Sequence, residues 1–107
     1  MTGFYPGRPP IDAYGNGGFR FAGISHKGSI LVLPSGIYAW SDHDDFSAVM
    51  AERGNIDLLV IGTGRTMLRR AVPGILADVM TTGAAVSTYN LLLAENRKVA
   101  AALVAVE

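Results

Sequence analysis

The sequence contains no cysteine, which excludes a disulfide-stapled scaffold and metal sites built from thiolates. Its longest apolar runs, residues 91–94 and 99–106, are far shorter than the roughly 20 residues that a membrane-spanning helix needs. The first ten residues also lack the basic start and the long apolar stretch of a signal peptide. These absences predict a cytoplasmic protein without a membrane span.

An excess of charge of either sign is also missing, because Lys and Arg together number 9 and so do Asp and Glu. Binding to nucleic acid without sequence preference draws on a positive field around the protein. Nucleic acid is therefore not an expected partner.

Hydrophobic residues, by contrast, make up 50% of the 107 residues, which is enough to form the core of one domain of ordinary size. Residues 1–10 are rich in proline and glycine, and we expect them to form a lead-in that is extended or poorly ordered. The remaining residues, 11–107, are expected to form a single domain.

Short β patterns separated by glycine dominate the sequence up to about residue 40. Residues 11–14 and 19–21 flank Gly15-Asn16-Gly17-Gly18, whose residues tolerate a positive φ and favour a tight reversal. This pattern predicts a β-hairpin. A turn at residues 26–28 is expected next, followed by two strands separated by a second turn, at 29–33 and 37–40.

Helical and strand patterns alternate in the second half. Residues 44–53 predict a short amphipathic helix that ends before Gly54. The almost continuously apolar residues 56–61 predict a strand buried on both faces, which we place at the centre of the sheet. The elements expected after it are a short helix at 66–72 before Pro73-Gly74, a strand at 75–80, the longest helix at 84–97 and a buried last strand at 99–106.

Three motifs occur in a characteristic order along these elements. They are Tyr14-Gly15 with Gly18-Phe19-Arg20-Phe21, then Leu59-Val60-Ile61-Gly62-Thr63-Gly64, then Thr88-Tyr89-Asn90 with Glu95-Asn96-Arg97. On these motifs the chain resembles the Mth-type domain family over residues 11–106. That family includes mitochondrial complex I assembly factor 3, an adipogenesis-associated human protein and many uncharacterised bacterial and archaeal proteins.

The resemblance implies a three-layer α/β fold with a central mixed sheet, helices on one side of it and an amino-terminal β-hairpin layer. It implies no catalytic residues. Relatives also have more residues than 65–74 between the Gly-Thr-Gly loop and the following strand, so we expect either a stunted crossover or, in preference, an omitted mobile segment. Such a segment would make Arg65, Arg69 and Arg70 a basic flap, although a solvated helix face is the favoured interpretation of these arginines.

Two glycine-containing loops follow the strands predicted at 56–61 and 75–80. If these strands are parallel, both loops lie at strand carboxyl ends, where open α/β sheets bind ligands, and the second loop leads into a helix whose amino terminus favours an anion. The favoured alternative is that the loops only make tight turns and cap the helix. The candidate ligand-binding residues, in loops 62–65 and 81–84, are Gly62, Thr63, Gly64, Arg65, Thr82 and Gly83.

The other polar clusters favour structural roles. Residues 41–45 contain Asp and His side chains that could hold a divalent ion, but capping of a helix is the simpler interpretation, so no metal site is predicted. Thr88 and Asn90 are expected to support the fold. Neither the phosphate-binding loop of nucleotide enzymes nor a serine elbow is present in the sequence, and we predict no catalytic residue and no cofactor.

The sequence therefore predicts a non-enzymatic binding or assembly protein with a protein partner, related to respiratory complex I assembly by resemblance alone. The alternative is a protein that binds a small anionic molecule, or an unrecognised enzyme, with its pocket between loops 62–65 and 81–84. Self-association is also expected, because the last strand is rich in alanine and valine and could present an exposed edge.

Overall fold

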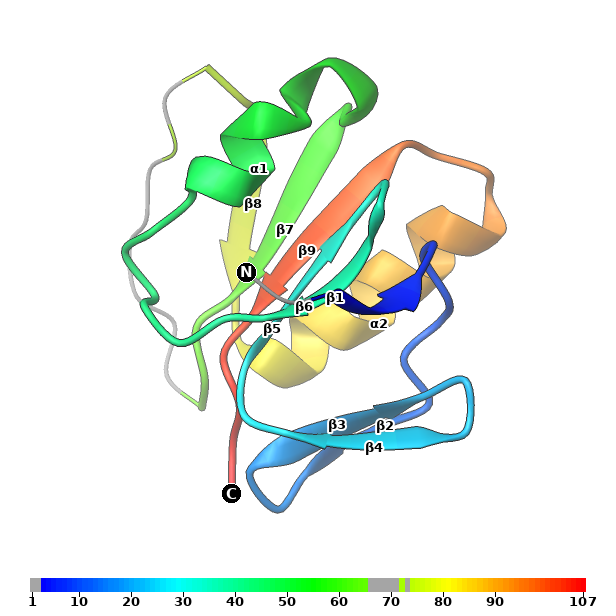
Figure 1. The fold of residues 1–107 in the computed structure, drawn as a ribbon, viewed down its shortest axis with the longest axis vertical. Helices are drawn as coiled ribbons and strands as arrows, with labels where there is room; N and C mark the ends of the chain where they lie inside the picture. The colour runs from blue at the N-terminus through cyan, green and yellow to red at the C-terminus, as the bar shows by residue number, and fades with distance from the viewer. Residues whose placement is uncertain (1–2, 66–71, 73) are drawn as a thin grey trace.

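The structure is a computed structural model that describes residues 3–65, 72 and 74–107. Figure 1 shows a large sheet, a small sheet and two α-helices. The large sheet has the strand order β1-β6-β5-β9-β7-β8, and the small sheet has the order β2-β3-β4. The strands are β1 (Gly3–Pro6), β2 (Ala13–Gly15), β3 (Gly18–Phe21), β4 (Ile24–Lys27), β5 (Ile30–Leu33), β6 (Gly36–Ala39), β7 (Leu58–Gly62), β8 (Ala77–Met80) and β9 (Val99–Leu103); the helices are α1 (Ser47–Ala51), the 3₁₀ helix η1 (Arg53–Asn55) and α2 (Thr82–Ala94).

The large sheet is mixed, as predicted, because β7 pairs in parallel with β8 and β9 while β5 pairs in antiparallel with β6 and β9. The strands in the middle of this sheet are β5 and β9, however, whereas β7, which was expected to be central, lies next to the edge strand β8. All five residues of β9 are buried, and three of them are alanines, so small side chains let the layers on both faces approach the middle of the sheet. The suggestion that the last strand presents an exposed edge is therefore wrong.

The three layers follow from the alternation of side chains along β5. Ile30 and Val32 pack in one cluster with α2 and the small sheet, whereas Leu31 and Leu33 pack in a second cluster with Val49 of α1. The predicted α/β fold with a β-hairpin layer is confirmed. The two helices nevertheless lie on opposite faces of the large sheet, because the short α1 covers apolar side chains that α2 cannot reach.

The small sheet is a meander with two tight reversals. Asn16 and Gly17 have φ values of 53° and 78° and connect β2 to β3, as the sequence predicts. Ala22 and Gly23 have φ values of 49° and 77° and connect β3 to β4. The turn expected at residues 26–28 falls largely inside β4, and the actual reversal was missed because alanine is rarely found at a positive φ.

The amino-terminal segment is extended but it is part of the fold. Strand β1 pairs with β6 at the edge of the large sheet. Beyond it, Arg8 donates a hydrogen bond from Nη1 to the main-chain oxygen of Val99 at 2.8 Å, and Pro9 accepts one from the Tyr89 hydroxyl at 2.8 Å. The segment is extended, which is one of the two expected alternatives, but the proline and glycine content of the sequence did not indicate these partners, which lie far along the chain.

The connection between β7 and β8 consists of residues 63–76. A parallel crossover needs about a dozen residues or more, so the continuous sequence suffices and no omitted segment is required. The predicted short helix, apart from Val72, and the arginines at positions 69 and 70 lie outside the described residues. Among the helices that the structure describes, none is long and apolar enough to span a membrane.

Candidate functional site

The two predicted loops lie side by side at the carboxyl ends of β7 and β8. Gly64 donates its main-chain N–H to the Thr82 hydroxyl at 2.9 Å, and Thr82 donates its own N–H to the Gly64 carbonyl at 2.9 Å. The N–H of Thr63 is bound to the carbonyl of Met80 at 3.0 Å. The parallel pairing of β7 with β8 produces this arrangement, because it brings both strand ends to one edge of the sheet.

Thr82 links the two loops to the chain that follows β9. Its side chain is fully buried, and its hydroxyl donates a hydrogen bond to the Val104 carbonyl at 2.6 Å while it accepts the one from Gly64. Gly62 is needed beside it, since a Cβ at that position would come within 2.9 Å of the Thr82 Cα. The hydroxyl of Thr63 likewise donates to the Met80 carbonyl at 3.3 Å. These three residues hold the loops together and face protein atoms.

An open depression of about 560 Å³ lies next to these loops. Three of the six predicted residues line it, namely Gly64, Arg65 and Gly83, together with Thr81. The remainder of the wall comes from segments remote in sequence: Tyr14 and Gly15 of the small sheet, and Val106 and Glu107 beyond β9. The local sequence did not identify these residues as part of this site, because the packing of the small sheet brings Tyr14 and Gly15 here and the position of β9 in the large sheet brings Val106 and Glu107.

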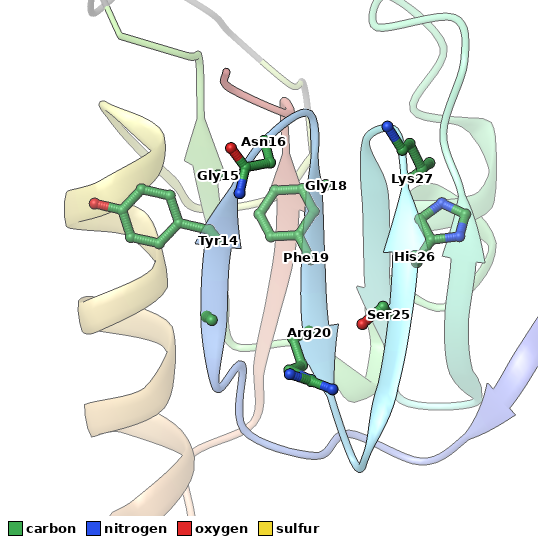
Figure 2. A pocket seen from close by; sticks show the side chains of 10 residues that line it. Tyr14, Gly15, Asn16, Gly18, Phe19, Arg20, Ser25, His26 and Lys27 are labelled. Atoms are coloured by element: carbon green, nitrogen blue, oxygen red, sulfur yellow. The ribbon is translucent and has the colours of Figure 1, made fainter.

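Arg65 and Tyr14 are the large side chains in this depression. The Arg65 guanidinium donates a hydrogen bond to the main-chain oxygen of Glu107, so the chain itself occupies part of the predicted anion site. Tyr14 extends from β2 over α2 (Figure 2), and a Cβ on Gly83 would overlap its hydroxyl. At the start of α2, the main-chain N–H groups of Gly83 and Ala84 have no hydrogen-bond partner among the described residues.

Side chains of α2 hold the amino-terminal segment and β8. Thr88 donates a hydrogen bond to the sulfur of Met80 at 3.4 Å, and Asn90 makes two hydrogen bonds with the main chain of Ile11. Tyr89 lies between them in sequence and is fully buried. Burial raises the pKa of its hydroxyl well above the ordinary value, by more than the nearby charge of Arg8 lowers it. The sequence placed Tyr89 in a family motif of the long helix without indicating its bond to Pro9, and it gave no indication of a role for Arg8.

Residues 41–45 form a loop stabilised by its own polar groups. Asp42 accepts a hydrogen bond from the N–H of Asp44 at 3.1 Å, and Asp45 accepts one from the N–H of Ser47 at 2.9 Å. Hydrogen bonds from the side chain and the main chain of Ser47 lower the pKa of the Asp45 carboxyl. Over the part of the chain that the structure describes, no group of three or more His, Asp or Glu residues could hold a metal ion.

A second hollow, of about 340 Å³, lies on the small sheet (Figure 2). All ten of its lining residues belong to β2, β3, β4 and the turn between β2 and β3. This surface was not among the predicted binding sites, because its strands were identified only as a meander that carries a family motif.

The sequence profile of a family described as "Protein of unknown function (DUF498/DUF598)" matches residues 11–104. The chain belongs to this family. An uncharacterised protein of Rhodobacter capsulatus is 37% identical to it over 107 residues, which cover 92% of this chain and 86% of that protein. Assembly factor 3 of the NADH dehydrogenase (ubiquinone) 1 alpha subcomplex, from mouse, is 30% identical over 94% of this chain, which spans only 62% of the mouse protein.

Solved structures agree with the family assignment. The crystal structure of a Bartonella henselae protein, described there as an outer membrane protein, has 51% sequence identity and a TM-score of 0.89, with 97% of this chain and 100% of that one covered. A Bordetella pertussis protein described as an Mth938-like domain shares the fold, with a TM-score of 0.72 at 23% identity, over 91% of this chain and 85% of that one. The profile match and the likeness to mouse assembly factor 3 confirm the predicted membership in the Mth-type domain family, and the Bordetella structure shows that the fold is shared.

Proposed function

We propose that this member of the DUF498/DUF598 family is a non-enzymatic binding protein that assists the assembly of a respiratory protein complex. The observation that carries this proposal is the likeness to mouse assembly factor 3, which extends over 94% of the chain. Because the chain spans 62% of that protein, the shared domain is expected to provide the binding surface and not every function of the longer protein.

The use of polar groups in the site supports a scaffold role. Thr82, Tyr89 and Asn90 each direct their side-chain polar atoms at main-chain groups of distant segments. In the described residues, every buried side-chain nitrogen and oxygen has a hydrogen-bond partner. Such saturation favours a rigid framework, whereas a catalytic site keeps reactive groups available to the substrate.

The proposal is tested by deleting the gene in the organism that makes the protein. Membranes of the deletion strain are expected to contain less assembled NADH dehydrogenase on native gels, and the wild-type gene should restore it. Succinate dehydrogenase activity in the same membranes is the control, because it reports general damage to respiration. A normal level of assembled NADH dehydrogenase in the deletion strain would contradict the proposal.

A second candidate function is the binding of a small anion in the depression beside Arg65. The observation that favours it is the convergence of the Arg65 guanidinium with the N–H groups at the start of α2, where the helix dipole attracts negative charge. Against it stands the bond from Arg65 to Glu107, which an anion would have to replace. A cytoplasmic location belongs to both candidates and remains a prediction.

Inorganic phosphate is the probe for this second function. Titration of the ¹⁵N-labelled protein should shift the amide signals of Gly83 and Ala84 first, and Arg65→Gln should weaken that response. Arg53→Gln is the matched control, since Arg53 is an exposed arginine on η1. Equal responses of the two variants would rule the anion site out.

Self-association stays a prediction that depends on a surface other than β9. Sedimentation at micromolar concentration measures it directly. A single species of 11.3 kDa would show that the chain is a monomer.

A further inference from the structure

The outer face of the small sheet carries small residues and two exposed, positively charged side chains. Because Phe19 and Phe21 are buried, the strand alternation directs their neighbours outward. The pairing of β2 with β3 and of β3 with β4 then groups six residues on the opposite surface, of which Gly18 alone is buried: Ala13, Gly15, Gly18, Arg20, Ser25 and Lys27. Ala13 and Gly15 add little side-chain bulk to this surface, so the main chain of another segment can come close to it.

Arg20 and Lys27 supply the only formal charge of this six-residue set, and both charges are positive. Both side chains are exposed. Within the described residues, neither the guanidinium of Arg20 nor the ammonium of Lys27 forms a hydrogen bond or an ion pair. Figure 2 shows their side chains on the adjacent strands β3 and β4, with Ser25 between them in the chain. The face therefore offers two cations that no acid of the described chain neutralises.

The spacing of these cations fits one kind of ligand. Arg20 pairs with Ser25 across the two strands, so Lys27, two residues further along β4, is its diagonal neighbour. Diagonal neighbours in an antiparallel pair lie about 7–8 Å apart. In an extended chain, side chains two residues apart point to the same side at a separation of about 6.5–7 Å. Two acidic residues at alternate positions of an extended segment thus have about the spacing of the two strand positions that carry Arg20 and Lys27.

Main-chain hydrogen bonds hold the small sheet in place without any partner. The N–H of Gly17, in the turn between β2 and β3, is bound to the Val106 carbonyl at 2.7 Å, and the N–H of Gly28 is bound to the Gly17 carbonyl at 2.7 Å. A surface that is already ordered loses little conformational entropy on binding.

We propose that the outer face of the small sheet binds an extended acidic segment of a partner protein, in which Asp or Glu occupies alternate positions opposite Arg20 and Lys27. This inference rests on the proposed assembly function, for which it specifies the chemistry of the partner. The binding test uses purified protein and is independent of the gene-deletion test. If the peptide does not bind, the effect of gene deletion on complex assembly can still be observed.

The test titrates the ¹⁵N-labelled chain with a short peptide of alternating Glu and Thr. Amide shifts are expected to be confined to residues 13–27, and Arg20→Glu with Lys27→Glu should weaken binding by about tenfold or more. The matched control is Arg97→Glu with Lys98→Glu, which makes the same charge change at two exposed residues before β9 and should leave the affinity nearly unchanged. A peptide of the same composition with its Glu residues in one block should bind more weakly.

Three results would overturn the inference. The first is a peptide-induced shift pattern outside residues 13–27, or none at all. The second is equal weakening by both double variants, which would indicate attraction by net charge alone. The third is binding to vesicles of phosphatidylglycerol and phosphatidylcholine without binding to the peptide, because the face would then recognise a lipid surface.

Discussion

Asn90 on α2 binds both main-chain groups of Ile11, a residue that precedes it by most of the length of the chain. Its Oδ1 accepts a hydrogen bond from the Ile11 N–H at 2.8 Å, and its Nδ2 donates one to the Ile11 carbonyl at 2.8 Å. One amide side chain thereby takes the place of a neighbouring strand for a segment that has none at that point. Ile11 is buried in the cluster shared by α2 and the small sheet, so the pair fixes where the small sheet begins.

We predict that Asn90→Ala lowers the free energy of unfolding by about 2–4 kcal/mol, because two partly buried main-chain groups lose their partner. Asn90→Asp should also destabilise the protein, since a carboxylate cannot donate to the Ile11 carbonyl. Urea denaturation measures both effects. Ser87→Ala, on the exposed side of the same helix, should change stability little, and comparable losses in Asn90→Ala and Ser87→Ala would contradict this role.

Gly62 allows β7 to pack closely on the start of α2. We predict that Gly62→Ala costs about 1–3 kcal/mol of stability, because the added Cβ would lie 2.9 Å from the Thr82 Cα and 3.0 Å from the Ala85 Cβ. Gly54→Ala is the control, since a Cβ there would meet nothing within 4 Å. Thermal unfolding of both variants decides the matter, and a neutral Gly62→Ala would show that the two elements can separate without cost.

Ala22 is strained in the reversal between β3 and β4, where its φ is 49°. A left-handed conformation costs a residue with a Cβ about 1–2 kcal/mol. Glycine removes this strain, but part of the gain is offset because glycine increases the conformational entropy of the unfolded chain. Ala22→Gly is therefore expected to raise the free energy of unfolding by about 0.5–1 kcal/mol. Ala84→Gly, in the first turns of α2, should have the opposite sign; a loss of stability in both variants would argue against strain at Ala22.

Tyr89 makes the free energy of unfolding decrease at alkaline pH. Because burial raises the pKa of its hydroxyl in the folded state, the folded protein retains a proton that the unfolded chain releases near its ordinary pKa of about 10. The stability from Tyr89 is therefore fully present below pH 10 and is lost as the pH rises toward the folded-state value.

Tyr89→Phe provides the measurement. At neutral pH it should be less stable by about 1 kcal/mol, since the hydrogen bond to Pro9 is removed. Above pH 10 its unfolding free energy should fall less steeply than that of the wild type in urea titrations at a series of pH values. Parallel curves for the two proteins would mean that another group causes the alkaline loss.

Local sequence patterns determined most of the secondary structure of this protein. The reversal at Asn16-Gly17 follows from residues that accept a positive φ, and the apolar runs that became β7 and β9 predicted buried strands because no face of them carries polar side chains. The glycine-containing loops after β7 and β8 could also be placed together, since parallel strands end at the same edge. The order of the motifs was enough to indicate the family.

Only the tertiary structure decided what those loops do and which surfaces remain available. The Thr82 hydroxyl is hydrogen-bonded to Gly64 and Val104, and Arg65 is hydrogen-bonded to Glu107. Val104 and Glu107 lie here because β9 passes between β5 and β7 and carries the chain end to this edge. In the same way, β1 joined the large sheet beside β6, and α1 covered the second face of that sheet. A local pattern depends on neighbours along the chain, whereas each of these outcomes depends on contacts between segments far apart in sequence, whose positions the packing of the whole domain fixes.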